Sequence, residues 1–272
     1  MRAATRDVWQ SLAQPGLLKV PELTVLFWVI KLLSTAMGES TSDYLVFNVD
    51  PYVAVVAGCV GLIAALTLQL RARRYVAWIY WLAVVMVAVF GTMVADVMHV
   101  VLGIPYIVST VLLAVVLGVV FVAWYRVERT LSIHTIRTPR RELFYWATVI
   151  ATFALGTAAG DLTAATFRLG YPGSIVLFAF LFAIPGLGFR FLGWNAVASF
   201  WTAYVITRPL GASVADWLGK PILGGLGIGD EYVALALTAV IVILVARLAI
   251  TREDVGHEPI SGAALDEVTD PY

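Results

Sequence analysis

The sequence predicts an all-α integral membrane protein with eight transmembrane helices, arranged as four parallel helical-hairpin repeats in a pseudo-symmetric bundle. The first observation is composition: of 272 residues, 61% are hydrophobic and 13% are charged. Soluble domains are nearer half apolar and a quarter charged, and a chain of this size cannot bury the excess in a water-exposed fold. The other two observations are eight long apolar runs and a motif that occurs four times.

Each apolar run approaches the roughly 20 residues that cross the hydrocarbon layer as a helix. The turn residues of 48–51, 103–105, 170–173 and 219–221 separate several of them, because proline and glycine interrupt helices there. Within the sixth run, Pro185 and Gly186 predict an early end. The expected spans, in order, are 23–43, 52–70, 76–99, 105–125, 143–163, 173–189, 193–217 and 232–250.

Basic residues are distributed unevenly between the two sets of span ends. Fourteen lie on the side of the termini, and only Arg168 and Lys220 lie in the opposite loops. Since cytoplasmic loops carry the excess of lysine and arginine, both termini are expected to be cytoplasmic. Residues 1–250 are then one transmembrane domain, with repeats over about 23–70, 76–125, 143–189 and 193–250. The acidic, aperiodic residues 251–272 predict a disordered cytoplasmic tail.

An aromatic residue and a tryptophan are followed, after nine residues, by glycine and, after four more, by aspartate. This spacing occurs four times, and the repeat starts are separated by 53, 65 and 55 residues. The copies are Phe27-Trp28 with Gly38 and Asp43, Tyr80-Trp81 with Gly91 and Asp96, Tyr145-Trp146 with Gly156 and Asp161, and Phe200-Trp201 with Gly211 and Asp216. Four copies with one spacing indicate an internal repeat.

We interpret each repeat as a helical hairpin with a signature helix, an external loop and a plainer return helix. Two spans per repeat give every repeat the same orientation, so the repeats are related by an axis along the membrane normal. The tryptophans are then expected near the cytoplasmic boundary, and the aspartates at one depth near the external end.

The four aspartates, Asp43, Asp96, Asp161 and Asp216, are the candidate cation-binding residues. Rings of acidic side chains select cations in membrane pathways, and an ionisable group in the membrane is a functional candidate. The alternative is a structural role in the wet interface or as a cap. An acid at a helix C-terminus opposes the helix dipole, so each placement needs a compensating cation from the protein or from solution.

Two interpretations are open for the four signature glycines, which are Gly38, Gly91, Gly156 and Gly211. They could form hinges whose exposed carbonyls coordinate a cation, or they could permit close helix packing. The aromatic-tryptophan pairs are interpreted as interface anchors.

The first repeat carries the most polar signature helix. Lys31, Thr35, Glu39 and Asp43 are spaced four apart and share one helix face. Glu39 is one turn deeper than the aspartates, so it is a candidate second ligand or proton carrier. Lys31 and Arg208 are candidates to balance the acids, as ion pairs or as a latch in the absence of ligand.

His99 follows Asp96 by three residues, so the two can share a helix face. An imidazole beside a carboxylate favours Mn²⁺, Fe²⁺ or Zn²⁺. The alternative is an ordinary interfacial histidine. The predicted metal ligands are therefore Glu39, Asp43, Asp96, His99, Asp161 and Asp216.

No P-loop, HExxH, GxSxG or dinucleotide-binding fingerprint is found, so we expect neither an enzyme nor a cofactor. The glycine-rich residues 224–230 are interpreted as an external loop. The balance of 18 basic and 18 acidic residues gives no basic surface for nucleic acid.

The segment VPELTVLFWVIKLLSTAMGESTSDYL, with its later echoes, resembles a family of small bacterial multi-pass membrane proteins usually catalogued as uncharacterised or membrane-anchored. The resemblance is most specific at Phe27-Trp28, Lys31, Gly38-Glu39 and Asp43. It implies a bacterial inner-membrane protein and no particular activity. Gly38 to Asp43 is also weakly similar to the E-x-G-D-[KR]-[ST] motif of cation/proton exchangers, in residue types but not in spacing.

We therefore expect a secondary transporter of a divalent cation such as Mn²⁺, working as a proton-coupled exporter, with the lipid bilayer, the cation and the proton as its partners. The first alternative is a membrane scaffold or sensor that regulates a partner protein without transport. The second is an intramembrane enzyme acting on a lipid, for which no positioned nucleophile is present.

Overall fold

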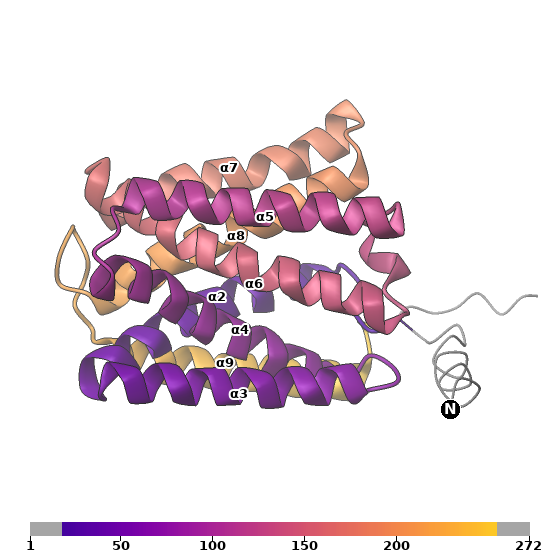
Figure 1. Cartoon of the computed structure of the whole chain (residues 1–272), viewed down its shortest axis with the longest axis horizontal. Helices are drawn as coiled ribbons and strands as arrows, with labels where there is room; N and C mark the ends of the chain where they lie inside the picture. The colour runs from indigo at the N-terminus through magenta and orange to yellow at the C-terminus, as the bar shows by residue number, and fades with distance from the viewer. Residues whose placement is uncertain (1–17, 255–272) are drawn as a thin grey trace, which may run out of the picture.

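The computed structural model describes residues 18–254, and this part of the chain is helical without a β-strand. Its eight long helices run side by side along the long axis of the molecule (Figure 1). They are α2 (Val25–Asn48), α3 (Pro51–Arg71), α4 (Ala77–Asp96), α5 (Tyr106–Glu128), α6 (Pro139–Asp161), α7 (Gly170–Leu192), α8 (Ala196–Gly219) and α9 (Asp230–Thr251). Short helical turns are η1 (Val97–Val101), η2 (Ile133–Thr135) and η3 (Leu162–Thr166).

Helix starts coincide with capping residues in the sequence. Asp50 caps α3 by accepting hydrogen bonds from two backbone amides, and Pro51 follows at the first helical position. Thr24 accepts from the amide of Phe27 at the start of α2, and Asn195 caps α8. These local signals explain why the eight expected spans match the eight helices within a few residues.

The four signature helices form the centre of the bundle. Helices α2, α4, α6 and α8 pack in a closed ring, in which α8 returns to contact α2. The end at which their aspartates lie is called the aspartate end below, and the opposite end the tryptophan end. Residues at equivalent repeat positions therefore lie around a common interior.

The outer helices correct the expected hairpins. Each return helix packs mainly on the signature helix of the next repeat: α3 on α4, α5 on α6, α7 on α8, and α9 on α2. Contacts inside a predicted hairpin are much less extensive. Three of these pairs, α3–α4, α5–α6 and α7–α8, are consecutive helices joined at the tryptophan end, and α9 closes the arrangement by covering the helix of the first repeat.

Two further expectations meet different outcomes. The early end of the sixth span is wrong, because α7 continues through Pro185 to Leu192. A proline removes one helix hydrogen bond, but neighbouring helices allow a membrane helix to continue through it, and α7 packs against α8. The expected tail of 251–272 lies outside the described residues beyond Asp254.

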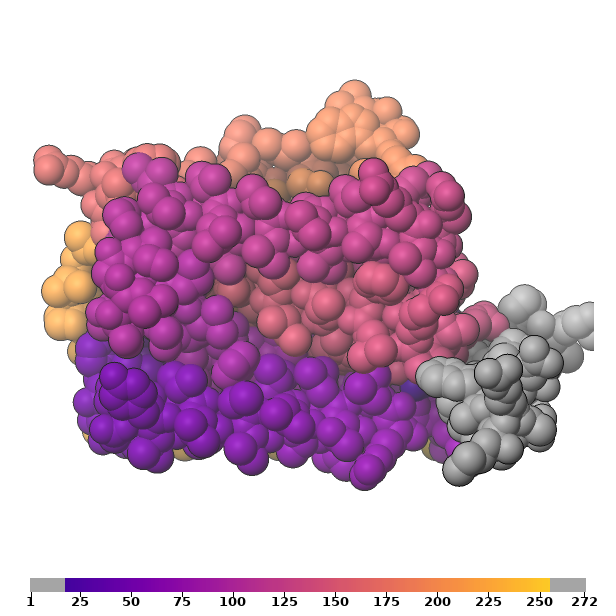
Figure 2. Space-filling model, viewed as in Figure 1, coloured from indigo at the N-terminus to yellow at the C-terminus, as the bar shows by residue number. Residues whose placement is uncertain are grey.

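The outer surface of the bundle is apolar. Large hydrophobic side chains are exposed along α3, α5, α7 and α9, for example Val60, Val111, Val119, Phe180 and Ile243. Figure 2 shows the molecule from the side on which α5 lies across the upper part and α3 across the lower part. A contiguous exposed apolar surface of this kind is untypical of a water-soluble monomer.

Six helices of the described chain are long and apolar enough to cross a membrane: α3, α4 with η1, α5, α6 with η3, α7 and α9. The two long helices outside this set are α2 and α8. They contain the buried charged residues of the interior, including Lys31, Glu39 and Arg208.

At the tryptophan end, residues 18–24 cross the helix ends and tie several of them together. Lys19 pairs with Glu142 of α6 at 2.6 Å, and Gln69 of α3 donates to the same carboxylate at 2.9 Å. The amide of Glu22 donates to the carbonyl of Asp254 at 3.0 Å, and the hydroxyl of Tyr75 donates to the Asp254 carboxylate. These contacts join the N-terminal segment to the helix ends that surround it.

The signature glycines are sites of close packing between inner helices. A Cβ at Gly38 would lie 2.3 Å from Ala88 Cβ, and one at Gly91 would lie 2.7 Å from Phe153 Cβ. A Cβ at Gly156 would likewise collide with the side chain of Arg208, and a Cβ at Gly211 with the side chain of Thr35. In each case the glycine faces the next signature helix around the ring. The helices continue unbroken through all four glycines, so the structure shows close packing at these positions, and a hinge role stays a prediction.

Candidate functional site

A buried ion pair lies in the middle of the bundle. Arg208 of α8 is fully buried and donates from Nη2 to Glu39 Oε2 of α2 at 2.5 Å. Its Nη1 also donates to the carbonyl of Thr35 at 3.2 Å. Burying a charge is costly unless it is paired and hydrogen bonded, so each of these residues requires the other.

Threonines from the other two signature helices complete this centre. Thr92 of α4 and Thr157 of α6 occupy the positions equivalent to Glu39, and both donate to Glu39 Oε2, at 3.1 and 3.4 Å. Arg208 Nη2 in turn donates to both hydroxyls, with a distance of 2.6 Å to Thr157. All four repeats therefore contribute to one polar layer, although Ala212, the fourth equivalent residue, carries no polar side chain.

One turn toward the aspartate end, acidic side chains converge. Carboxylate oxygens of Glu39, Asp43 and Asp216 lie within 4.8 Å of one another, and all three residues are buried. The ammonium of Lys220 lies 2.9 Å from Asp43 Oδ2 and 2.7 Å from Asp216 Oδ1. Two inner helices, α2 and α8, are thus bridged by a lysine from the loop that follows α8.

The environment of Lys220 keeps it charged. Burial alone would lower its pKa, but the carboxylates of Asp216 and Asp43 outweigh burial and hold the pKa of Lys220 well above its usual value. Lys220 is therefore an ammonium cation at every physiological pH.

A cavity of about 390 Å³ opens at the aspartate end above this cluster. Five acidic residues line it, together with Lys220 and the aromatic rings of Tyr106 and Tyr171; the acids are Glu39, Asp43, Asp96, Asp161 and Asp230. Asp96 and Asp161 are the last residues of α4 and α6, each followed by a π-helical turn, a geometry frequent at functional sites. Ser42 donates to Asp96 Oδ2 at 3.4 Å.

The structure brings the four signature aspartates to one end of the bundle in two different settings. Asp43 and Asp216 are buried and bridged by Lys220. Asp96 and Asp161 are half-buried on the cavity wall. Acidic side chains thus outnumber the two cations, Arg208 and Lys220, that contact them.

His99 is placed apart from this cluster. Its Nδ1 lies 2.9 Å from the carbonyl oxygen of Ile104, and its ring stacks on Tyr106. It neither lines the cavity nor joins the three convergent acids. The contacts with Ile104 and Tyr106 hold His99 at the turn between η1 and α5.

Of the two predicted charge-balancing residues, only Arg208 contacts an acid. Lys31 is fully buried, and its ammonium has no hydrogen-bond partner. It lies 3.9 Å from the centroid of the Phe153 ring and 4.3 Å from that of Tyr204, and aromatic faces attract cations. The expectation that Lys31 forms an ion pair is therefore wrong in this conformation.

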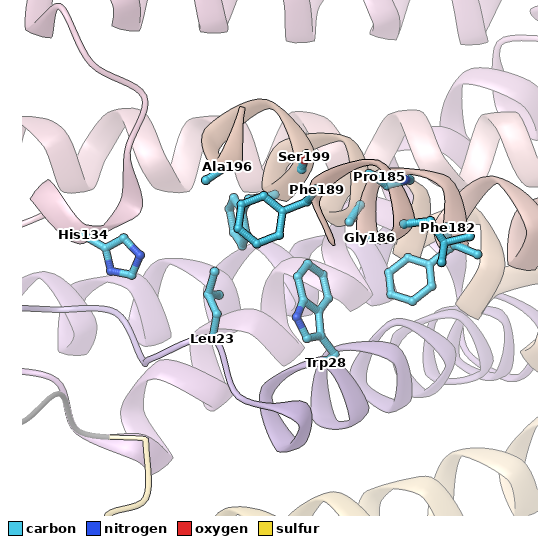
Figure 3. Close-up of a pocket in the computed structure, with 13 residues that line it drawn as sticks. Leu23, Trp28, His134, Phe182, Pro185, Gly186, Phe189, Ala196 and Ser199 are labelled. Carbon is cyan, nitrogen blue, oxygen red and sulfur yellow. The ribbon is translucent and has the colours of Figure 1, made fainter. Parts of the chain in front are cut away.

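A second, larger pocket of about 600 Å³ lies toward the tryptophan end. It is lined mostly by apolar residues of α2, α7 and α8, and Figure 3 shows Trp28 between Leu23 and Phe182, with Pro185 and Gly186 on the α7 side. His134 and Ser199 are the polar residues on its wall. Nothing in this pocket resembles a charged or catalytic centre, so the acidic cavity is the candidate functional site.

Sequence reasoning missed Lys220 as a site residue, because it counted Lys220 only as a loop charge. It follows Asp216 by four residues, and that spacing is the one signal that could have identified it. It also missed Asp230, whose place on the cavity wall depends on the return of the 220–229 loop.

A family model described as "Repeat of Unknown Function (DUF347)" matches the chain four times, over residues 26–75, 79–130, 144–189 and 199–254. Each match begins at a signature helix, which confirms the fourfold internal repeat. The comparisons show no relationship to the acidic-motif cation/proton exchangers. No curated protein and no solved structure matches the chain.

Proposed function

Because the chain belongs to the DUF347 repeat family, which has no assigned function, we propose an activity from the site alone: the protein is an integral membrane transporter of a divalent cation such as Mn²⁺. The observation that carries this proposal is the convergence of Glu39, Asp43 and Asp216 within 4.8 Å at an acidic cavity. Carboxylate oxygens are the ligands preferred by Mg²⁺, Ca²⁺ and Mn²⁺. Asp43 and Asp216 would hold the cation, with Asp96 and Asp161 guiding it from the cavity.

The membrane setting is part of the proposal. Six apolar helices of spanning length and an apolar outer surface support insertion into a bilayer. The excess of basic residues at the tryptophan end supports a cytoplasmic location for that end and for both termini. The inner membrane of a bacterium remains the predicted location.

Glu39 differs from a simple metal ligand, because its carboxylate is already paired with Arg208. Arginine does not lose its proton in proteins, so Glu39 has a permanent cationic partner in Arg208. An arriving cation would meet the ion pair at the floor of the site, beneath Asp43 and Asp216. Proton-coupled export stays a prediction, which flux under an imposed pH gradient tests.

The experiment is Mn²⁺ and proton flux into proteoliposomes that contain the purified full-length protein. Asp43→Asn and Asp216→Asn should each reduce Mn²⁺ flux at least tenfold. Asp50→Asn is the matched control, because Asp50 is an exposed acid that caps α3 at the same end and asparagine caps equally well. Absence of flux in the wild type with Mn²⁺, Mg²⁺ and Ca²⁺ would overturn the proposal and favour the scaffold or sensor.

A further inference from the structure

Lys220 reaches the acidic cluster from a loop that folds back over the end of α8. Its backbone amide donates to the carbonyl of Asp216 at 2.9 Å. The loop then returns along the helix end, with the amides of Leu226, Ile228 and Gly229 donating to carbonyls of residues 217–219. Gly224, Gly227 and Gly229 adopt positive φ, which non-glycine residues rarely accept, so the return depends on the glycine-rich sequence.

The ammonium of Lys220 lies between the carboxylates of two helices, α2 and α8. It lies 2.9 Å from Asp43 and 2.7 Å from Asp216. Apart from Lys220, neither Asp43 Oδ2 nor Asp216 Oδ1 has a hydrogen-bond partner among the described residues, so the lysine charge is what compensates these buried oxygens. The carboxylates are 7% and 4% exposed, while the lysine side chain is 21% exposed, which places the lysine on the accessible side.

We propose that Lys220 is a tethered competitor for the transported cation, which fills the Asp43–Asp216 position in the unloaded protein and leaves it when a divalent cation binds. The inference rests on the proposed function and adds a mechanism to the same site. A divalent cation offers two charges where the ammonium offers one, so it can displace the lysine into the cavity. The empty site then never presents two uncompensated buried carboxylates.

Displacement has a measurable consequence for affinity. A site that is free for only a fraction of the time binds its ligand more weakly by that fraction. If Lys220 occupies the site nine times in ten, its removal tightens binding by about tenfold. Damage to the fold would weaken binding, so a gain in affinity separates this mechanism from a structural role of Lys220.

The test is calorimetric titration of Mn²⁺ into the purified full-length protein in detergent. Lys220→Met and Lys220→Gln should each bind Mn²⁺ about tenfold more tightly than the wild type, and Lys220→Arg should bind no more tightly than the wild type. Arg168→Met is the matched control, because Arg168 is an exposed basic residue of another loop at the same end. Its removal changes net charge equally and should alter affinity less than twofold, since exposed charges are screened.

The outcomes separate the two proposals. Unchanged or weaker Mn²⁺ binding in both Lys220→Met and Lys220→Gln, with a wild type that binds, overturns the competitor and leaves the cation site standing. An equal gain in Arg168→Met also overturns it, because the effect would then be general electrostatics. Failure of the wild type and of every variant to bind Mn²⁺ overturns the competitor together with the proposed site.

Discussion

Two fully buried basic side chains, Arg208 and Lys31, both lie against the ring of Phe153, but only Arg208 is paired with an acid. Arg208 is bound by Glu39, Thr92 and Thr157. Lys31 contacts the faces of two aromatic rings and has no hydrogen-bond partner. Removing the two side chains should therefore have opposite effects on stability.

Arg208→Met should strongly destabilise the protein, because it leaves Glu39 as a buried anion without its cation. Breaking a buried pair at one partner costs about 3–5 kcal/mol. The double variant Glu39→Gln/Arg208→Met should recover much of that loss, since no buried charge remains. Thermal unfolding in detergent measures both, and a double variant that unfolds below Arg208→Met would contradict the pairing argument.

Lys31→Met should stabilise the protein by about 1–3 kcal/mol, the cost of a buried polar group without a partner. Methionine is similar in length and fits among Phe153 and Tyr204. The measurement is the unfolding temperature of Lys31→Met compared with that of the wild type and of Lys31→Arg, because arginine keeps a basic side chain and adds volume. A lower unfolding temperature in Lys31→Met would show that the ammonium has a stabilising role.

At the scale of the helix, the signature glycines set the distance between neighbours in the ring. Gly156→Ala places a Cβ 2.3 Å from Arg208 Cγ and 2.5 Å from Arg208 Cβ. Such overpacking costs about 1–3 kcal/mol, and here it also displaces the arginine of the ion pair. Gly118→Ala in α5 is the matched control, because no atom lies within 4 Å of its Cβ position.

We expect Gly156→Ala to unfold at a lower temperature than the wild type and Gly118→Ala to unfold at an equal or higher one, since alanine favours a helix over glycine by about 1 kcal/mol. Thermal unfolding of the two variants in one detergent is the measurement. Equal destabilisation of both would reject close packing as the reason for the repeated glycine.

The connection at the tryptophan end has its own pH dependence. Burial raises the pKa of Asp254 above its ordinary value, against the hydrogen bond from Tyr75. A raised folded-state pKa gives a stabilising contribution that is complete below the unfolded value of about 3.9 and is lost as pH rises through the folded value. Acidification from pH 7 toward about 4 should therefore stabilise this contact.

The measurement is the difference in unfolding temperature between the wild type and Asp254→Asn over that pH range. Because the other acids titrate in both proteins, the difference isolates Asp254. The unfolding temperature of the wild type should rise relative to that of Asp254→Asn as pH falls. A difference that is constant, or that shrinks on acidification, would reject the contribution of Asp254.

For the whole molecule, sequence periodicity predicted the repeat and the helices, because equal spacing on equally oriented helices brings equivalent residues to similar depths. It did not predict which outer helix covers which inner helix, since that depends on packing at the loops rather than on the apolar pattern. It predicted that Arg208 balances an acid and failed for Lys31, because position on a helix face does not determine the partner across the axis. It could not place Lys220, whose contact with Asp43 depends on the fold of a loop.

The orientation of the bundle in a membrane is predicted from charges spread over the entire sequence. The sequence assigns fourteen basic residues to the side of the termini, against Arg168 and Lys220 on the opposite side, and the excess of lysine and arginine predicts that the tryptophan end faces the cytoplasm. The acidic cavity should then open to the outside. Single-cysteine variants in a Cys59→Ser background can report this, since Cys59 is the one native cysteine.

Val49→Cys and Ile222→Cys introduce thiols at exposed positions of the aspartate end, and Arg73→Cys introduces one in the exposed turn between α3 and α4. In intact cells, a membrane-impermeant maleimide should label the first two and should label Arg73→Cys only after permeabilisation. The reverse pattern would place the cavity in the cytoplasm. Labelling of all three in intact cells would contradict the membrane-spanning bundle itself, because a bilayer around the apolar outer helices must separate the two ends.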